Sequence, residues 1–418
     1  RDHESSYRRW PSSVEVFLPK GRPPEVGEIF VQKDLAKSIQ YMADEEAAQK
    51  GKGRLAGLKA ARDAFYRGDI AKTIAKYHAE NGGWVTADDL ASYEVSLEPV
   101  VSVKFNGVDV YSCGPWCQGP VMTETLSILN GYDLKSMGHN SAAYIHTVAE
   151  ALKLSFSDRH RYYGDPKFVK VPIDTLLSET FAAERRKQLR ADQAWQELPP
   201  SGDVPGFPPS TPLPAPASGK PNPPADTSYA CVVDKQGNAF STTPSDGSSA
   251  TPVIPGIGLC PSSRGSQSWT IPNHPAVMAP GKRPRLTPSP ALAMKDGKLF
   301  MPFGSPGNDI QPQAMTQVFL NVALWGMDPQ TAIEAPRFAT YSFPGSSAPH
   351  KYHPGRLSIE ARVPAETMKA LEKLGHRVSA WPELEWKAGA VCAIRAHQDT
   401  GLLEAGADPR RPCYALGV

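Results

Sequence analysis

The sequence predicts an α+β fold in which stacked β-sheets are covered by helices. From Leu35 to Leu189 the apolar residues recur mostly at helical spacing. A segment from Pro199 to Pro224 then contains eleven prolines mixed with Ser, Gly and Ala, a composition typical of an extended, solvated linker. After this linker, strand-like segments come first, helices next and strands again.

Capping and turn residues delimit the elements predicted before the linker. Thr86 precedes acidic residues and is a good helix N-cap, and Pro120 opens a helix that Gly131 closes. Asn106 and Gly107 form a turn between two strands. The predicted helices are 35–48, 55–66, 70–78, one from 86, 120–129, one capped near 140–141 that runs to 156, and 176–189; the predicted strands are 100–105 and 108–112.

After the linker, β-branched and aromatic residues alternate with Gly and Pro, which indicates short strands separated by turns. Asp328 is a candidate helix N-cap in this part. The predicted strands are 228–233, 239–243, 291–295, 299–303, 391–395 and 402–405; the predicted helices are 314–325, 328–333 and 365–374.

Composition limits the classes of partner. The 418 residues are 40% hydrophobic and 21% charged, as in a globular protein, and the net charge of +2 gives no electrostatic case for a nucleic-acid partner. No apolar run reaches the length of a membrane span, so we expect no membrane partner. The chain begins at Arg1 without Met or a signal-peptide pattern, so we expect a further portion upstream, and cytoplasmic and periplasmic locations stay equally open.

Cysteine and histidine spacing indicates neither a redox motif nor a metal site. Cys113 and Cys117 are separated by three residues, whereas a thioredoxin-type motif has two between its cysteines. His350 and His353 lie in a loop without convincing ligand spacing. We therefore expect no metal and no cofactor.

The junction between Asp226 and Thr227 is the most informative point of the chain. The proline-rich linker ends there, and a strand pattern begins directly at Thr227. Cleavage at this junction would give Thr227 a free α-amine, which can act as general base for the hydroxyl of the same residue. The alternative is an ordinary strand-opening threonine after a domain connection.

Six segments in order along the chain resemble the γ-glutamyltranspeptidase family of N-terminal nucleophile hydrolases. These segments are 81–90, 149–158 with 164–166, 227–238, 274–284, 303–313 and 406–410. The resemblance covers nearly the whole chain, and it corresponds to the later part of the family's large subunit and the complete small subunit.

The resemblance implies a four-layer αββα sandwich made by one polypeptide that cleaves itself. Residues 1–198 would be the C-terminal part of the large subunit, 199–226 the linker that ends at the cleavage site, and 227–418 the small subunit. It implies a heterodimer of large and small subunits, possible pairing of two such heterodimers, a small-molecule amide as substrate and no cofactor.

The resemblance also assigns catalytic roles. Thr227 would be the nucleophile, and the backbone N–H groups of Gly307 and Asn308 would bind the oxyanion, although the family has a second glycine where this chain has Asn308. Ser245 stands where the family has a threonine that hydrogen-bonds the nucleophile; the alternative is a turn residue in a Ser/Thr-rich stretch.

The positions that hold a γ-glutamyl group in the family are mostly changed. Gly247 replaces an asparagine, Thr287 is the second of a pair that replaces two serines, and Arg264 lies near the place of an acid that pairs with the substrate ammonium. We expect Arg264 to contact a substrate carboxylate, with a structural arginine as the alternative. Tyr229 and Asp309 complete the predicted substrate-binding residues.

These changes favour a divergent branch of the family that includes cephalosporin-acylase-like and oxamate-amidohydrolase-like proteins. We expect a self-processing amide hydrolase acting on a small acyl-amide other than a standard γ-glutamyl substrate. The alternatives are a γ-glutamyltransferase or glutathione hydrolase, and an uncleaved, catalytically silent protein with a binding or structural role.

Overall fold

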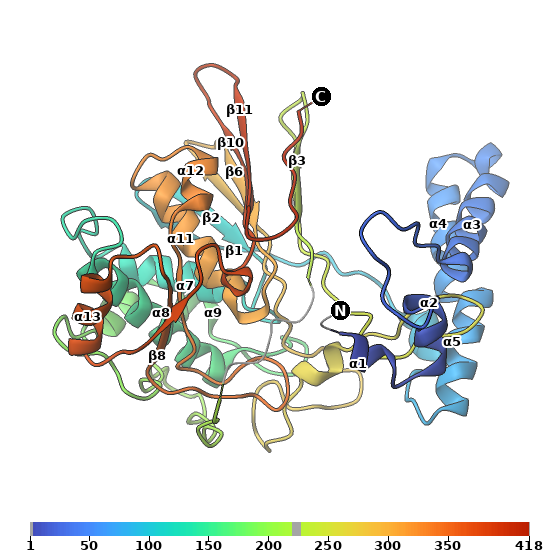
Figure 1. The fold of residues 1–418 in the computed structure, drawn as a ribbon, viewed down its shortest axis with the longest axis horizontal. Coiled ribbons are helices and arrows are strands. Elements are labelled where there is room, and N and C mark those ends of the chain that lie inside the picture. The colour runs from blue at the N-terminus through green and yellow to red at the C-terminus, as the bar shows by residue number, and fades with distance from the viewer. Residues whose placement is uncertain (1–2, 220–226, 418) are drawn as a thin grey trace. The chain divides into compact units, whose positions relative to one another are not determined.

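The computed structural model describes residues 3–219 and 227–417, which belong to two compact units (Figure 1). One unit comprises Arg1–Leu97 and Gly247–Ser263, and the other comprises Glu98–Asp246 and Arg264–Val418. Helices and sheets are both present, so the predicted α+β class is confirmed. The expected subunit boundary before Thr227 depends on cleavage of a peptide bond rather than on packing, and it stays a prediction.

The first unit is helical and has a small core. Helix α3 packs against α4, and α4 packs against α5. Gly57 permits the close approach of α3 and α4, because a Cβ at this position would lie 3.0 Å from Cγ of Glu46. Ile70, Ile254 and Ile257 form the buried centre. The helices of this unit are α1 (Glu4–Tyr7), α2 (Pro11–Phe17), α3 (Lys33–Ala48), α4 (Arg54–Tyr66), α5 (Asp69–Glu80) and α6 (Ala87–Ser92).

The second unit is built on an antiparallel six-stranded sheet of order β1-β2-β5-β6-β10-β11. Asn106 and Gly107 both have positive φ, 48° and 80°, as the predicted β1–β2 turn requires. Alternate residues of β1 are buried, as expected for a sheet with one well-covered face. The strands are β1 (Val101–Phe105), β2 (Val108–Ser112), β5 (Ala291–Lys295), β6 (Lys298–Gly304), β10 (Cys392–Ala396) and β11 (Leu403–Ala407).

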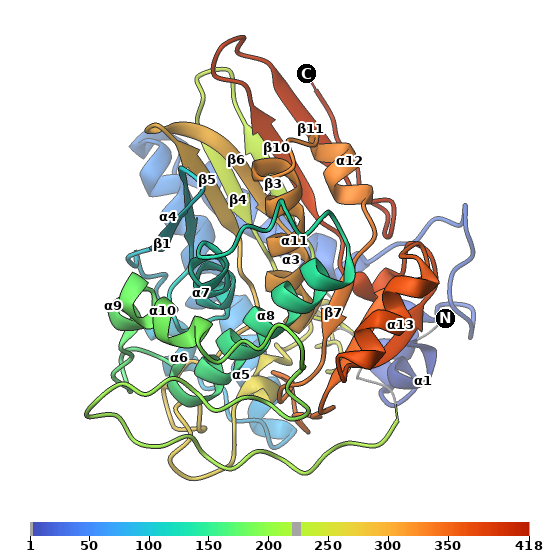
Figure 2. The ribbon, with the colours of Figure 1, turned by 90° about the vertical axis from the view of Figure 1, so that its left-hand side faces the viewer.

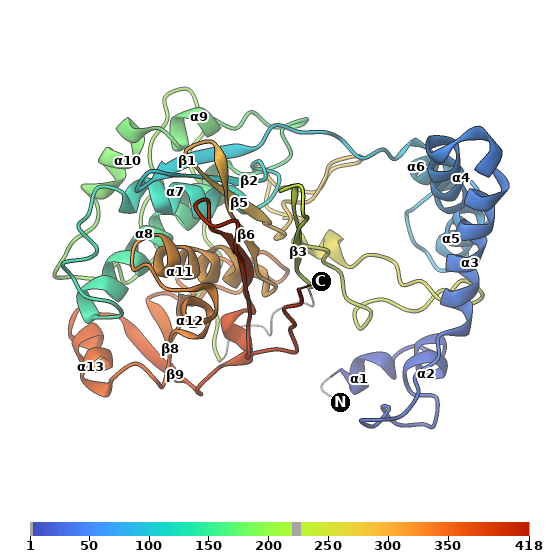
Figure 3. The same ribbon diagram turned by 90° about the horizontal axis from the view of Figure 1, so that it is seen from above.

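Helices and a hairpin cover opposite faces of this sheet (Figures 2 and 3). α7 (Gly119–Leu129) and α11 (Gln311–Ala323) lie on one face, and α8 (Ala142–Tyr162) packs on α7. The hairpin of β3 (Ala230–Val233) and β4 (Ala239–Thr242) packs against β6 and β10. The described elements thus form helical, sheet and hairpin layers. A second helical layer is not among them, and the four-layer arrangement stays a prediction.

A three-stranded sheet was not predicted. β7 (Phe338–Thr340) is antiparallel to β8 (Arg356–Glu360), and β8 is parallel to β9 (Arg377–Trp381) through the crossover helix α13 (Ala365–Lys373). The sequence does not indicate β8, because Ser358 and Glu360 are polar residues that are nevertheless fully buried. Glu360 is paired with Arg410 at 2.6 Å. The neighbouring helix α12 (Pro329–Glu334) is capped by Asp328, as predicted.

The predicted helix 176–189 is confirmed in its middle, but its bounds are wrong. Two short helices stand in its place, α9 (Ile173–Leu176) and α10 (Glu179–Arg186). The hydroxyl of Ser178 accepts a hydrogen bond from the N–H of Phe181 and starts α10 as a separate helix.

The first part of the proline-rich segment is packed rather than solvated, which corrects the expectation of a solvated linker. Tyr162 donates to the carbonyl of Gly202 at 2.7 Å, and Asp158 accepts from the N–H of Gly202 at 2.6 Å. Leu198 and Val204 are buried on either side. Polar residues of α8 therefore make hydrogen bonds to the backbone of this segment, which is too rich in proline to form the backbone hydrogen bonds of a β-sheet. Among the described residues, no helix is both long and apolar enough to cross a membrane.

Candidate active site

Thr227 lies just before β3, and its side chain is only 7% exposed. The N–H of the next residue, Ser228, donates to the carbonyl of Pro244 at 2.9 Å and holds the start of the strand. Thr227 Oγ1 lies 2.7 Å from Oγ of Ser245. Asp226, on the other side of the predicted cleavage point, lies outside the described residues.

Arg264 contacts Ser245 twice. Its Nε donates to the Ser245 carbonyl at 3.0 Å, and its Nη2 donates to Ser245 Oγ. A guanidinium can only donate, so Ser245 Oγ accepts from Arg264 and keeps its own proton for another acceptor. Arg264, Ser245 and Thr227 form a chain of hydrogen bonds, and a substrate contact of Arg264 stays a prediction.

The turn after β6 holds the two predicted oxyanion donors. Gly307 has φ 124°, and Asn308 has φ 54°, which is the left-handed region that asparagine tolerates better than most residues. The carbonyl of Gly307 accepts from the N–H of Ile310 at 3.0 Å. Within the described part of the chain, the N–H groups of Gly307 and Asn308 donate no hydrogen bond. Both donors are therefore available to a ligand.

A buried polar network holds this turn from behind. Gln118 is fully buried, and its Nε2 donates to the carbonyls of Asn308 at 2.6 Å and Thr287 at 2.9 Å. Gln118 Oε1 accepts from Arg159 at 3.0 Å. Arg159 also pairs with Asp309 at 2.5 Å, and Asp309 accepts from the N–H of Ser346 at 2.7 Å. Burial favours a raised pKa for Asp309, but Arg159 and Ser346 outweigh it and hold this pKa below its usual range.

Two cavities border the turn. The larger, about 470 Å³, is lined by Thr227 and by Pro306, which directly precedes Gly307. The smaller, about 50 Å³, is lined by Gly307 and Asn308 but not by Thr227. Only the larger cavity combines the predicted nucleophile with room for a substrate. Its lining residues are Thr227, Ser228, Tyr229, Pro306, Trp386, Ala390, Cys392, Arg411, Pro412, Cys413 and Tyr414.

The other predicted binding residues fall in different environments. Tyr229 lines the larger cavity, its hydroxyl lies 2.8 Å from Ser241 Oγ, and burial raises the pKa of this hydroxyl. Thr287 is fully buried, and its Oγ1 accepts from Gln267 at 3.2 Å. Gly247 belongs to the other compact unit. Substrate contacts of these residues and of Asp309 stay predictions.

No pattern in the sequence indicated Gln118, Arg159, Trp386 or Arg411 as site residues. Gln118 stands just before a predicted helix, and Arg159 lies near the end of α8, where a charged residue normally faces water. Their partners are distant in sequence, so only the folded structure brings them to the turn.

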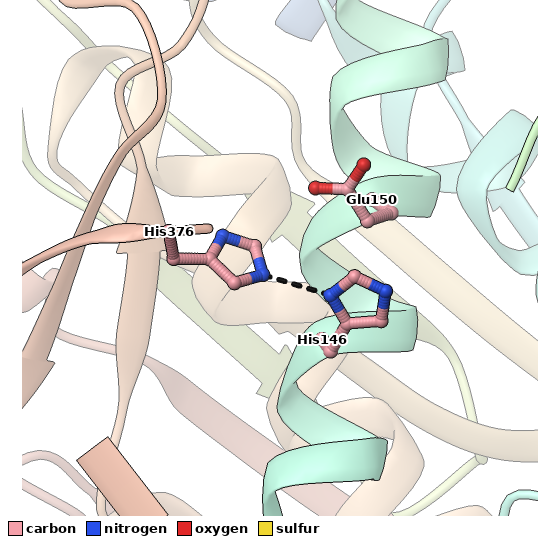
Figure 4. Close-up of side chains that lie close together, drawn as sticks. All are labelled: His146, Glu150 and His376. Atoms are coloured by element: carbon pink, nitrogen blue, oxygen red, sulfur yellow. Dashed lines mark hydrogen bonds between the residues drawn. The ribbon is translucent and has the colours of Figure 1, made fainter. Parts of the chain in front are cut away.

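A buried cluster of His146, Glu150 and His376 has the donor atoms of a metal site (Figure 4). Hydrogen bonds already account for most of these donors. His146 Nε2 must donate to the carbonyl of Arg190 at 2.7 Å, so its Nδ1 accepts from His376 Nε2 at 2.9 Å. One oxygen of Glu150 pairs with Lys153 at 2.6 Å, so a cation is already in place. The cluster ties α8 to the start of β9 without needing a metal.

Stability is expected to fall as the pH drops from about 6.5, the usual histidine pKa, toward 4. Burial is the main cause that lowers the pKa of His160 to about 4 and that of His376 to about 2. Above the unfolded pKa both residues are neutral in both states, whereas below it only the unfolded chain takes up protons. Each residue then lowers the free energy of unfolding by about 1.4 kcal/mol per pH unit.

Urea denaturation midpoints at pH 7.0 and pH 5.0 check this expectation. His376→Gln should reduce the difference between the two midpoints, because glutamine cannot take up a proton in the unfolded chain. An unchanged difference in this variant would contradict the assignment to His376.

Comparison with known proteins is consistent with this arrangement. The whole chain, residues 1–418, matches the family described as Gamma-glutamyltranspeptidase. The glutathione hydrolase-like YwrD proenzyme of Bacillus subtilis (strain 168) is 32% identical over 412 residues, which cover 98% of this chain and 70% of the relative. The oxamate amidohydrolase proenzyme of Klebsiella pneumoniae is 29% identical over 415 residues, with 98% and 70% covered.

Two solved structures share the fold. LmbA2991HD superposes with a TM-score of 0.90 at 34% identity, covering 100% of this chain and 74% of the other. Cephalosporin acylase from Bacillus halodurans gives 0.81 at 27% identity, covering 99% and 69%. Acylase-like and oxamate-amidohydrolase-like proteins are both among the relatives, so the predicted resemblance is confirmed. On these grounds the chain belongs to the γ-glutamyltranspeptidase family.

Proposed function

We propose that this protein is a self-processing amide hydrolase that acts through Thr227 on a small acyl-amide. The observation that carries the proposal is the 2.7 Å contact between Thr227 Oγ1 and Ser245 Oγ on the wall of a cavity of about 470 Å³. The N–H groups of Gly307 and Asn308 in the nearby turn, which donate to no group of residues 3–219 and 227–417, support it. The relatives that are named proenzymes are consistent with self-processing.

The proposed reaction begins with cleavage between Asp226 and Thr227. The new α-amine of Thr227 takes the proton from its own hydroxyl, and the oxygen attacks the substrate carbonyl. The N–H groups of Gly307 and Asn308 bind the oxyanion that forms. The α-ammonium returns the proton to the leaving amine, which departs and leaves an acyl-ester on Thr227. Water, activated by the same amine, hydrolyses the ester and releases a carboxylic acid.

Arg264 and Ser245 would support the nucleophile. Because Ser245 Oγ accepts from Arg264, its proton can point toward Thr227 Oγ1. That hydrogen bond stabilises the Thr227 oxygen as it loses its own proton to the α-amine. Each of the participating groups comes from the chain itself, and the proposed chemistry calls for no cofactor.

The proposed mature protein is a heterodimer of a chain that ends at Asp226 and a chain of residues 227–418. The small subunit would complete the four-layer sandwich together with the large one.

The mass of the denatured protein tests self-processing. We expect two fragments that separate before Thr227, and we expect Thr227→Ser to be cleaved as well, because serine retains a hydroxyl nucleophile. A single unsplit chain under conditions in which the protein is folded would instead favour a silent binding protein. Turnover of γ-glutamyl, oxamyl and glutaryl amides would then identify the acyl group.

A further inference from the structure

Two cysteines meet in the wall of the cavity of about 470 Å³ that Thr227 lines, which we call the Thr227 cavity. Cys392 and Cys413 both line this cavity, and both are only partly buried. Their thiols are hydrogen-bond partners of each other. Within the described part of the chain, neither cysteine forms a disulfide. The fold therefore places two reduced thiols together where a small solute in the cavity can reach them.

Buried contacts fix the backbone near both sulfurs. Cys392 is the first residue of β10, which pairs with β6 on one side and with β11 on the other. Shortly before Cys413, Arg410 is buried and pairs with Glu360 at 2.6 Å. Beyond Cys413 the chain is open to solvent, and Tyr414 is 82% exposed. Packing thus brings the sulfurs together, and the exposed end of the chain allows the Cys413 side of the pair to shift.

The hydrogen bond gives the two thiols different reactivity. Cys392 donates to the sulfur of Cys413, which lowers the pKa of Cys413 to about 7 and raises the pKa of Cys392. At pH 7 about half of Cys413 is therefore a thiolate. The thiolate is the form that reacts with oxidants, and a neighbouring thiol can then resolve the oxidised sulfur.

We propose that Cys392 and Cys413 form a redox switch in the wall of the Thr227 cavity, which a peroxide closes to a disulfide and a thiol reductant opens. The Cys413 sulfur attacks one peroxide oxygen, the O–O bond breaks, and a sulfenic acid and hydroxide form; the hydroxide takes a proton from solvent. The Cys392 sulfur then attacks the Cys413 sulfur. The S–O bond breaks, and hydroxide leaves with the proton of Cys392 as a second water. One peroxide is thereby reduced and two thiols are oxidised.

The other cysteines fit this role less well. Cys231 is near Cys392, but its hydrogen-bond partner is Tyr229, and it does not line the Thr227 cavity. Cys113 and Cys117 form a second close pair. Cys117 is fully buried, and burial raises its pKa. This second pair lies away from the cavity lining and provides the matched control.

Closing the switch should change the cavity wall. Pro412, Cys413 and Tyr414 all line the Thr227 cavity. A disulfide bond is much shorter than a hydrogen bond between two sulfurs, so its formation draws this segment toward β10. We expect kcat/KM for amide substrates to fall at least about tenfold, because small displacements at a reacting centre have large effects on rate. This expectation for turnover rests on the proposed function, whereas formation of the disulfide does not.

The test compares the self-processed protein before and after brief treatment with dilute hydrogen peroxide. A peptide map without reductant should show the peptides of Cys392 and Cys413 joined, with the loss of two hydrogen atoms, and dithiothreitol should restore both thiols and turnover. Cys413→Ser should form no such bond and keep its own rate under peroxide. Cys392→Ser should stop at a sulfenic acid on Cys413, which dimedone traps. Cys113→Ser is the matched control and should respond to peroxide as wild type does.

The peptide map and the rate decide different claims. Absence of a disulfide between Cys392 and Cys413 in peroxide-treated, folded wild type would overturn the inference. Turnover that is unchanged by the mapped disulfide, or that falls equally in Cys413→Ser, would overturn the switch as well. A reversible disulfide at this place in a protein that hydrolyses no amide would retain the oxidation site and overturn the proposed function instead.

Discussion

Thr227→Ala is expected to leave the chain uncleaved and to lower amide turnover by at least about 10³-fold. The variant lacks the hydroxyl oxygen that, in the proposed mechanism, attacks both the chain's own peptide bond and the substrate. The side chain is nearly buried and its Oγ1 contacts Ser245 at 2.7 Å, so alanine removes one hydrogen bond and little volume. The fold should therefore survive, and mass and turnover can be read on a folded protein.

Ser245→Ala is the graded control for this prediction. It removes the partner of Thr227 Oγ1 but leaves the nucleophile in place, so cleavage should be slower rather than absent. Cleavage and turnover of Thr227→Ala at the wild-type rate would show that another residue carries the chemistry.

Gln118→Glu is expected to lower kcat about 10- to 100-fold with a smaller change in KM, by analogy with the loss of an oxyanion donor. The glutamine amide donates to the carbonyl of Asn308 at 2.6 Å and to that of Thr287 at 2.9 Å. A carboxylate at the same place cannot donate to either carbonyl and would repel both. The turn should then rotate, and the N–H of Asn308 would no longer point at the oxyanion.

Gln317→Glu is the matched control for Gln118→Glu. Gln317 is buried as well, and its Nε2 donates to the carbonyls of Gln313 at 3.0 Å and Phe338 at 2.8 Å, but it does not contact the turn. Both variants should be less stable than wild type. Only Gln118→Glu should have a lower kcat when activity is divided by the amount of self-processed protein. Equal kcat values in the two variants would mean that Gln118 supports the fold and not the reaction.

Elements with local signals could be predicted from the sequence. β2 and β5 begin and end at the predicted residues because alternation and turn residues mark both ends. The predicted Thr86 cap is confirmed by a capping box with Asp89 at the start of α6. β8 was missed because burial of Glu360 depends on Arg410, fifty residues further along the chain. Packing of Gly202 on α8 was missed for the same reason, since its partners lie about forty residues away.

The residues of the candidate site also fall into those that the sequence indicates and those that it does not. Thr227 and the turn of Gly307 and Asn308 stand out through composition and family resemblance. Gln118 and Arg159 are common polar residues. Their role in the site depends on contacts with residues that lie 190 and 150 positions further along the chain. No periodicity or spacing rule connects such residues, so their contacts with the turn of Gly307 and Asn308 can be recognised only in the folded structure.

The central claim is that Thr227 carries the acyl group, and mass analysis of the trapped intermediate tests it most directly. The self-processed protein is mixed briefly with an activated acyl substrate, quenched in acid and digested. Our account predicts that the 227–418 chain gains the mass of one acyl group and that the adduct maps to Thr227. Among the described residues no cysteine forms a disulfide, so the six thiols are alternative acyl acceptors. An adduct on a cysteine, or no adduct despite steady turnover, would contradict the account.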